Sequence, residues 1–341
     1  MATYTVGASG GDYTTLAAAI AAASTGDTIS ILANFSHDNT TVTVNKTDLT
    51  IESATETAAD AVIASSLSKT ISLSNNGVAL KNLTINNTYT STGYALYANK
   101  TFSMQDCILS MSHVTAGHCI YGPKSGSTIV RTQLSGGSRG ITQATSSQPF
   151  TVDSCLFKNH NFAGMYNSVG EVTIRNCTVY ANTSTSGTPY GIYTGTTKEN
   201  VTIYNTIVYV NGSNGLDYGI RMGAYASNTI KNCIVFGNPI TADYDGEESP
   251  TVSDRLLDTD DVTADGNPVF ETLGSDFHPD TSGVAYHSGL AAGAPTLDLD
   301  GNEFDRPPSR GCLEAVSTGI PRAVLEATGA GFLNNPFTIT L

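Results

Sequence analysis

The chain has little charge for its size. Only 13% of its 341 residues are Asp, Glu, Lys or Arg, whereas 40% are hydrophobic. The solvent-facing positions must therefore be mostly uncharged Ser, Thr, Asn and Gly, which is more typical of extracellular fibres than of cytosolic enzymes. The 16 basic residues are outnumbered by 30 acidic ones, giving a net charge of −14. This balance opposes binding to phosphate backbones and anionic membranes, so we expect neither partner.

Two kinds of apolar segment are also missing. Residues 1–11 lack the basic start and apolar stretch of a secretory signal peptide. No run of 18 apolar residues suggests a membrane span. An extracellular type of surface without an export signal fits a bacteriophage structural protein released by lysis, or a trimmed chain. We therefore expect a location on a virion or an extracellular surface.

The pattern of Cys and His residues predicts no metal site. No Cys–His spacing matches zinc ligands, and the six His residues form no known ligand spacing. Four of the six Cys recur at one position of a repeated phrase, which predicts a column of small, buried, reduced thiols rather than disulfides. We expect no cofactor.

A short phrase of alternating apolar and polar residues recurs down the middle of the chain. Its central polar residues are Asn82, Asp106, Thr132, Ser154, Asn176, Asn205 and Asn232, at spacings of 24, 26, 22, 22, 29 and 27. Each interval is too short for a strand–helix–strand crossover, which needs about 30 residues. Stacked coils of short strands, a parallel β-solenoid, explain such a period.

A second phrase keeps the same variable period. Its apolar centres are Leu96, Ile120, Ile141, Met165, Ile192 and Ile220, which we expect to stack inward in one column. The Asn at the centre of the first phrase resets the in/out alternation. We interpret it as a corner residue, because Asn tolerates left-handed backbone geometry, and stacked Asn side chains can form a ladder.

The ends of the chain carry a family resemblance. Residues 10–32 (GGDYTTLAAAIAAASTGDTISIL) resemble the opening of pectin-lyase-like right-handed parallel β-helix proteins, with a capping helix over residues 13–23. The Asn-Cys phrases resemble the coils of that family. Residues 266–291 and 297–316 resemble its C-terminal phrase, although Gly311-Cys312-Leu313-Glu314 replaces the usual Gly-Ala-x-Glu. The resemblance implies an all-β fold, and right-handed crossovers are the general preference.

The sequence divides into four segments. They are an N-terminal cap (1–35), β-helix coils (36–240), acidic C-terminal coils and loops (241–316) and an apolar tail (317–341). The resemblance says little about function, because the fold hosts lyases, hydrolases, esterases, adhesins and viral spikes.

Candidate catalytic residues lie in an outward column just before the corners. Asp153 would lie between Arg131 and Arg175 on adjacent coils, as an anionic-sugar site or as a surface ion-pair ladder. Glu171 is near a coil edge and forms no obvious carboxylate pair for glycoside hydrolysis. Acidic residues are sparse between 60 and 240, which argues against a hydrolase or a calcium-dependent lyase.

Two further groups are candidates for binding. The second phrase displays Tyr97, Tyr121, Tyr166 and Tyr193, which suit glycan contact, a subunit interface or plain stacking within the chain. Asp298 and Asp300 have oxygen-ligand character for calcium, although a turn held by Asp side chains explains them as well.

The C-terminal tail is too apolar for a free end. Its large apolar residues are Phe332, Leu333, Phe337, Ile339 and Leu341, which suit docking or assembly into a homotrimer. The leading hypothesis is a non-enzymatic structural or adhesive β-helix of a phage particle, such as a spike, fibre or decoration protein. Its candidate partners are other virion proteins and a polysaccharide. The alternatives are a polysaccharide lyase or glycosidase of the same fold, and a bacterial surface adhesin.

Overall fold

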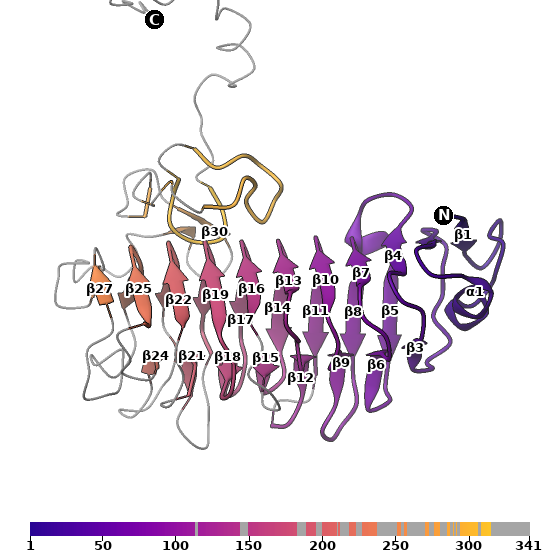
Figure 1. Cartoon of the computed structure of the whole chain (residues 1–341), viewed down its shortest axis with the longest axis horizontal. Helices are drawn as coiled ribbons and strands as arrows, with labels where there is room; N and C mark the ends of the chain where they lie inside the picture. Colours follow the sequence, from indigo (N-terminus) through magenta and orange to yellow (C-terminus); the bar gives the residue numbers. More distant parts are fainter. Residues whose placement is uncertain are drawn as a thin grey trace, which may run out of the picture.

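Coils of three short strands, stacked along one axis, make up the molecule (Figure 1). The structure, a computed structural model, describes residues 1–112, 115–143, 149–182, 189–195, 200–209, 211, 218–222 and 227–236, then 251–253, 256–257, 270–272, 276–279, 285–286, 289, 291, 294–305 and 308–314. Each strand pairs in parallel with its counterpart one coil away, which confirms the predicted solenoid.

The coils build three parallel sheets. The first contains β1 (Thr3–Val6), β2 (Thr28–Ile31), β4 (Thr50–Ser53), β7 (Val78–Lys81), β10 (Phe102–Gln105), β13 (Ser127–Val130), β16 (Phe150–Asp153), β19 (Val172–Arg175), β22 (Val201–Tyr204), β25 (Thr229–Lys231) and β27 (Thr251–Ser253). The second contains β5 (Val62–Ser65), β8 (Thr84–Asn87), β11 (Ile108–Met111), β14 (Gln133–Gly136), β17 (Leu156–Lys158), β20 (Thr178–Tyr180), β23 (Ile207–Tyr209), β26 (Ile234–Phe236) and β28 (Leu256–Leu257). The third contains β3 (Val42–Val44), β6 (Lys69–Leu73), β9 (Tyr94–Tyr97), β12 (His118–Tyr121), β15 (Arg139–Gln143), β18 (Ala163–Asn167), β21 (Tyr190–Tyr193) and β24 (Tyr218–Arg221).

The predicted inward column of the third sheet is confirmed. Ile120 is in register with Leu96 and Ile141, and Met165 with Ile141 and Ile192. All of these side chains are buried. Apolar side chains from the three sheets therefore fill one core that runs along the axis.

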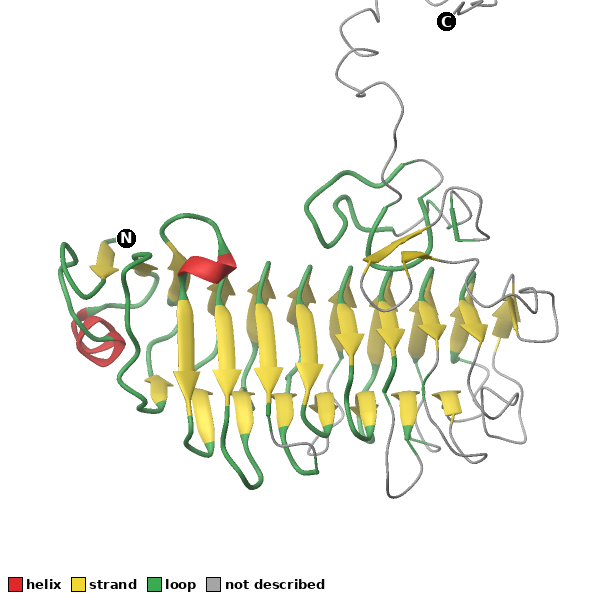
Figure 2. Ribbon diagram, turned by 180° about the vertical axis from the view of Figure 1, so that it is seen from behind, coloured by secondary structure: helices red, strands yellow, loops and turns green. Residues whose placement is uncertain are grey.

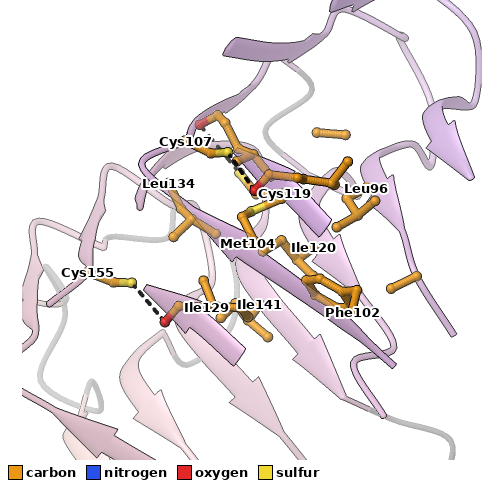
Figure 3. Close-up of a cluster of buried hydrophobic side chains, with 14 of the residues drawn as sticks. Leu96, Phe102, Met104, Cys107, Cys119, Ile120, Ile129, Leu134, Ile141 and Cys155 are labelled. Carbon is orange, nitrogen blue, oxygen red and sulfur yellow. Dashed lines mark hydrogen bonds between the residues drawn. The ribbon is translucent and has the colours of Figure 1, made fainter. Parts of the chain in front are cut away.

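All six cysteines are buried and unbridged, as predicted. The thiols of Cys107 and Cys155 lie 3.6 Å from the carbonyl oxygens of Leu80 and Ile129 on the preceding coil (Figure 3). Burial raises the pKa of Cys107 to about 12. Such a thiol stays protonated at neutral pH and behaves as a small apolar side chain.

The corners between the first and second sheets have left-handed backbone, as expected for Asn. Asn82, Asn176, Asn205 and Asn232 have φ between 46° and 56°. The predicted corner at Thr132 is wrong, because Arg131 takes that position with a φ of 43°. Thr132 instead occupies the buried position that Cys fills in other coils.

The N-terminal cap contains the predicted helix in a shorter form. Helix α1 (Leu16–Ala22) begins three residues after Tyr13, because Thr15 caps it and accepts a hydrogen bond from the backbone of Ala18. Tyr13 instead forms a β-bridge with Val6. The helix buries Leu16 and Ile20 at the end of the solenoid (Figure 1). Among the described residues, no helix has the length and apolar character needed to cross a bilayer.

The described C-terminal residues beyond β28 return along the solenoid instead of adding to its three sheets. The antiparallel pair β29 (Phe270–Thr272) and β30 (Asp276–Pro279) belongs to this segment, and residues 294–305 and 308–314 lie over earlier coils (Figure 1). Ser154 donates to the carbonyl of Leu297 at 3.0 Å, and Gly311 donates to the carbonyl of Asn205 at 2.7 Å. The apolar tail 317–341, with its five large apolar residues, lies outside the described residues.

Candidate functional site

A polar groove of about 890 Å³ lies over the corners of the early coils. The loop after β4, which carries the short 3-10 helix η1 (Ala58–Asp60), forms one wall (red in Figure 2). Residues 299–301 of the returning C-terminal segment line it as well. Its charged and amide side chains are Glu52, Glu56, Lys81, Asn82, Gln105, Asp106, Arg131, Gln133 and Asp300. The groove therefore depends on segments about 250 residues apart in the chain.

An ion pair between adjacent coils fixes part of the groove. Arg131 Nε lies 2.6 Å from Asp106 Oδ1, and Arg131 Nη2 lies 2.7 Å from Asp106 Oδ2. Gln105 also donates to Asp106 Oδ2 at 2.7 Å. Two parallel hydrogen bonds give the guanidinium a fixed orientation, so both side chains are held in place before any ligand arrives.

Other charged groups in the groove have no ion-pair partner in the described part of the chain. Glu52 and Lys81 occupy registered positions on β4 and β7, and both are half-buried. Glu56 is exposed on the loop. Asp300, by contrast, lies 3.3 Å from His278 Nε2. The groove thus presents two carboxylates and one ammonium group to a ligand.

The four candidate catalytic residues from the sequence do not converge. Asp153 pairs with Arg175 at 2.6 and 2.5 Å. The predicted ladder through Arg131 is wrong, because Asp153 is in register with Val130, and Arg131 turns toward Asp106. The predicted register of that coil was one residue out, because Val130 is the outward residue and Arg131 is the corner.

The Asp153 pair is largely buried, and Glu171 lies far from it along the strand. Burial raises the pKa of the Asp153 carboxyl, and the Arg175 guanidinium opposes that rise. Glu171 precedes β19, whereas Arg175 ends it, so the two lie at opposite edges of the first sheet. Glu171 accepts a hydrogen bond from Asn200 at 3.2 Å and lines a smaller depression of about 350 Å³.

The candidate tyrosines stack in two pairs along the third sheet. The ring centroids of Tyr97 and Tyr121 are 5.5 Å apart, and those of Tyr166 and Tyr193 are 4.7 Å apart. Thr142 separates the pairs, at the register position between Tyr121 and Tyr166. The ring faces therefore pack on each other within the chain.

A second row of side chains on the third sheet was missed by the sequence argument. It contains Lys69, Tyr94, His118, Arg139, Tyr190 and Tyr218, each three residues before the position of the tyrosine row. The buried Ala163 interrupts the row between Arg139 and Tyr190. Two consecutive inward residues separate the rows, so a pattern with period two does not reveal this row. The recurrence of aromatic or basic residues at both ends of YALY, HCIY, YGIY and YGIR was the available signal.

Asp298 organises a turn. Its carboxylate accepts hydrogen bonds from the backbone of Asn302 at 2.7 Å and of Glu314 at 3.0 Å. Burial raises the pKa of Asp298. Asp300 is exposed beside His278. Within the described stretches, no group of three or more His, Cys, Asp or Glu side chains is placed to hold a metal ion.

Comparisons with known proteins agree on the architecture. Residues 109–267 match the family described as right handed beta helix region. A crystal structure of pectate lyase Pel9A superposes with a TM-score of 0.55 at 13% identity, covering 92% of this chain and 96% of that one. A deglycosylated pectin methylesterase from Aspergillus niger gives 0.38 at 17% identity, covering 78% and 91%. No curated protein matches in sequence. At 13% identity the likeness to the pectate lyase shows the fold alone.

Proposed function

The chain has the pectin-lyase-like right-handed parallel β-helix fold, and from this premise we propose that it binds a polysaccharide in the groove without cleaving it. Polysaccharide-active enzymes and structural proteins share this fold, so the site must decide between them. The observation that carries the proposal is the polar groove itself, with a floor built from several rigid coils and lining segments from both ends of the chain.

The state of the acids favours binding over hydrolysis. Glycoside hydrolysis needs one carboxyl group that donates a proton and a second one across the scissile bond. Asp106 accepts two hydrogen bonds from Arg131 and one from Gln105. A carboxyl group engaged in this way is not free to approach a scissile bond, and its partners form a fixed polar surface for sugar hydroxyls.

We place this groove on a particle surface, as part of a phage spike, fibre or decoration protein. The low charge of the chain and the continuous backbone ladders suit a rigid display rod. The apolar residues of the tail would then join three copies into a trimer. Light scattering of the native chain and of a variant lacking residues 320–341 tests this, since a monomer in both forms contradicts it.

A depolymerase remains the second candidate, and a specific observation favours it. Lys81 has no ion-pair partner among the described residues, and it lies next to Glu52 in a groove that also holds Arg131. A lysine amine within reach of a bound sugar can act as the general base of a β-elimination. New double bonds or new reducing ends in a polysaccharide incubated with the protein would identify this activity.

Affinity electrophoresis with a panel of polysaccharides in the gel tests the groove. We expect the protein to be retarded by at least one polymer that it leaves at full length. The double variant Glu52→Gln/Lys81→Met should lose most of that retardation, whereas Lys46→Met, outside the groove, should not. Retardation unchanged in the double variant would overturn the proposed site, and a shortened polymer would replace binding with cleavage.

A further inference from the structure

The groove over the early corners carries more negative than positive charge. Its lining includes four carboxylates and two cations, which are Glu52, Glu56, Asp106, Asp300, Lys81 and Arg131. The ion pair of Asp106 with Arg131 cancels one charge of each sign. The net charge of −14 on the whole chain adds to the negative potential. An acidic polysaccharide would therefore be repelled from this groove, whereas a positively charged one would be attracted.

Two of these carboxylates are available to a ligand. Glu52 is half-buried on β4, and Glu56 is exposed on the loop that follows that strand. Within the described ranges of the chain, neither carboxylate has an ion-pair or hydrogen-bond partner. A carboxylate that is partly removed from water without a partner loses hydration energy, and a cation supplied by the ligand would offset that loss.

The segments that present the groove residues are fixed by hydrogen bonds. Thr55 donates to Asp60 Oδ2 at 2.7 Å, and Thr84 on the next coil donates to the carbonyl of Ala58 at 2.9 Å. In the returning C-terminal segment, the backbone of Leu299 donates to the carbonyl of Cys312 at 2.7 Å. Figure 2 shows η1 (red) and this segment over the same side of the solenoid. A ligand therefore meets a preorganised site and does not have to order these segments.

The groove also offers an apolar contact. Ile108 lines it and, at 36% exposure, is one of three large apolar side chains left exposed in the described part of the chain. The amide of Gln133 lies in the same groove, at the register position next to Ile108. A sugar ring has an apolar face of C–H groups and a rim of hydroxyl groups, so these two side chains can contact both.

We propose that the groove selects polysaccharides that carry free amino groups, such as polymers of N-deacetylated hexosamine. The ammonium groups of the polymer form charge-assisted hydrogen bonds with Glu52 and Glu56. Ile108 packs against a ring face, and Lys81 donates to a hydroxyl oxygen of the sugar. This inference rests on the proposed function, because it names the class of polysaccharide that the same groove binds.

The matched probes are glycol chitosan, a soluble polymer of amino sugars, and the same polymer after N-acetylation, which removes its charge. Titration calorimetry is done at about pH 6, where amines are protonated and glutamates are ionised. We expect the parent chain to bind the amino polymer at least tenfold more tightly than the acetylated one. Glu52→Gln/Glu56→Gln should raise the dissociation constant for the amino polymer at least tenfold. Asp38→Asn/Asp48→Asn removes the same charge from exposed positions outside the groove and should leave it unchanged.

Four results would overturn this inference. Equal losses in the two double variants would indicate a general attraction between a polycation and an acidic chain. Equal binding of poly-L-lysine, with the same loss in Glu52→Gln/Glu56→Gln, would show that the groove takes any polycation. Absence of binding to both sugar polymers would also exclude an amino-sugar ligand. The fourth result is equal affinity for the two sugar polymers, both lost in Glu52→Gln/Lys81→Met.

The fourth result would reject the selection by charge but leave the groove as a polysaccharide site. Binding that persists unchanged in both groove variants would instead overturn the proposed function as well. If Glu52→Gln/Glu56→Gln unfolds by circular dichroism, Glu56→Gln on the exposed loop gives the same comparison against Asp48→Asn.

Discussion

At the scale of single residues, the corners show what the local sequence can and cannot reveal. Asn82, Asn176, Asn205 and Asn232 were predictable as corners, because Asn adopts positive φ more readily than most residues. Arg131 was not predictable, because an arginine at a φ of 43° is held there by its ion pair with a residue one coil earlier. That contact is distant in sequence, so local propensity pointed to the wrong residue.

The asparagine ladder gives a test at this scale. Asn205 donates to Asn176 Oδ1 at 3.2 Å and accepts from Asn232 Nδ2 at 3.0 Å, with all three side chains buried. Asn205→Ala should lower the free energy of unfolding by about 2–4 kcal/mol, because it adds backbone strain and leaves buried amides unpaired. Asn205→Gly relieves the strain alone and should cost less. Urea denaturation measures both, and equal losses would contradict the strain argument.

The buried side chain of His160 should make the free energy of unfolding depend on pH. Burial lowers the pKa of His160 to about 4, and its Nε2 atom is buried without a partner. The unfolded chain, with a pKa of about 6.5, binds the proton more readily. The free energy of unfolding should therefore fall as pH drops from about 6.5 to 4, by about 2–3 kcal/mol for this group.

The variant His160→Gln isolates that contribution. Urea denaturation at pH 7 and pH 4 should show a smaller loss of stability on acidification in this variant than in the parent chain. His278→Gln is the control, because His278 is partly exposed and ion-paired. An unchanged loss in His160→Gln would show that other groups cause the acid sensitivity.

At the scale of elements, the third sheet departs from simple alternation. The sequence correctly predicted its inward Ile column and its tyrosine row, but the residue before each Ile also points inward. In β15, β18 and β21 that residue is Gly, because a Cβ there would meet a carbonyl oxygen of the next coil. Close approach between coils is a tertiary constraint, so the second outward row did not follow from a period-two pattern.

Gly191 tests this constraint. A Cβ at Gly191 would lie 2.5 Å from the carbonyl oxygen of Gly219 and 2.6 Å from Val208 Cγ1. Gly191→Ala should therefore lower the free energy of unfolding by about 1–3 kcal/mol, as overpacked cores do. Ala95→Gly, at the same position of an earlier coil, should cost only about 0.5–1 kcal/mol through backbone entropy. A thermal melt that leaves Gly191→Ala unchanged would contradict the close approach.

At the scale of the whole molecule, the C-terminal segment completes both the core and the groove. A second apolar cluster joins it to the later coils and contains Leu156, Ile207, Tyr209, Ile234, Phe277, Ala285, Cys312 and Leu313. Arg310 donates to Asn232 Oδ1 at 2.8 Å within the same contact. The sequence resemblance predicted that this segment exists. It did not predict that the segment returns across the coils, because the contacts between them join residues about 80 to 140 positions apart.

Truncation separates this role from that of the apolar tail. Removing residues 297–341 exposes Ile207 and Ile234 to water and takes Leu299 and Asp300 from the groove. We expect a lower melting temperature, binding of a hydrophobic dye, and weaker retardation by the polysaccharide that the groove binds. Removing only residues 320–341 leaves the return segment in place. This shorter truncation should keep the melting temperature, the low dye binding and the retardation of the parent chain. If the two truncated chains have the same melting temperature and the same dye binding, the return segment does not stabilise the solenoid.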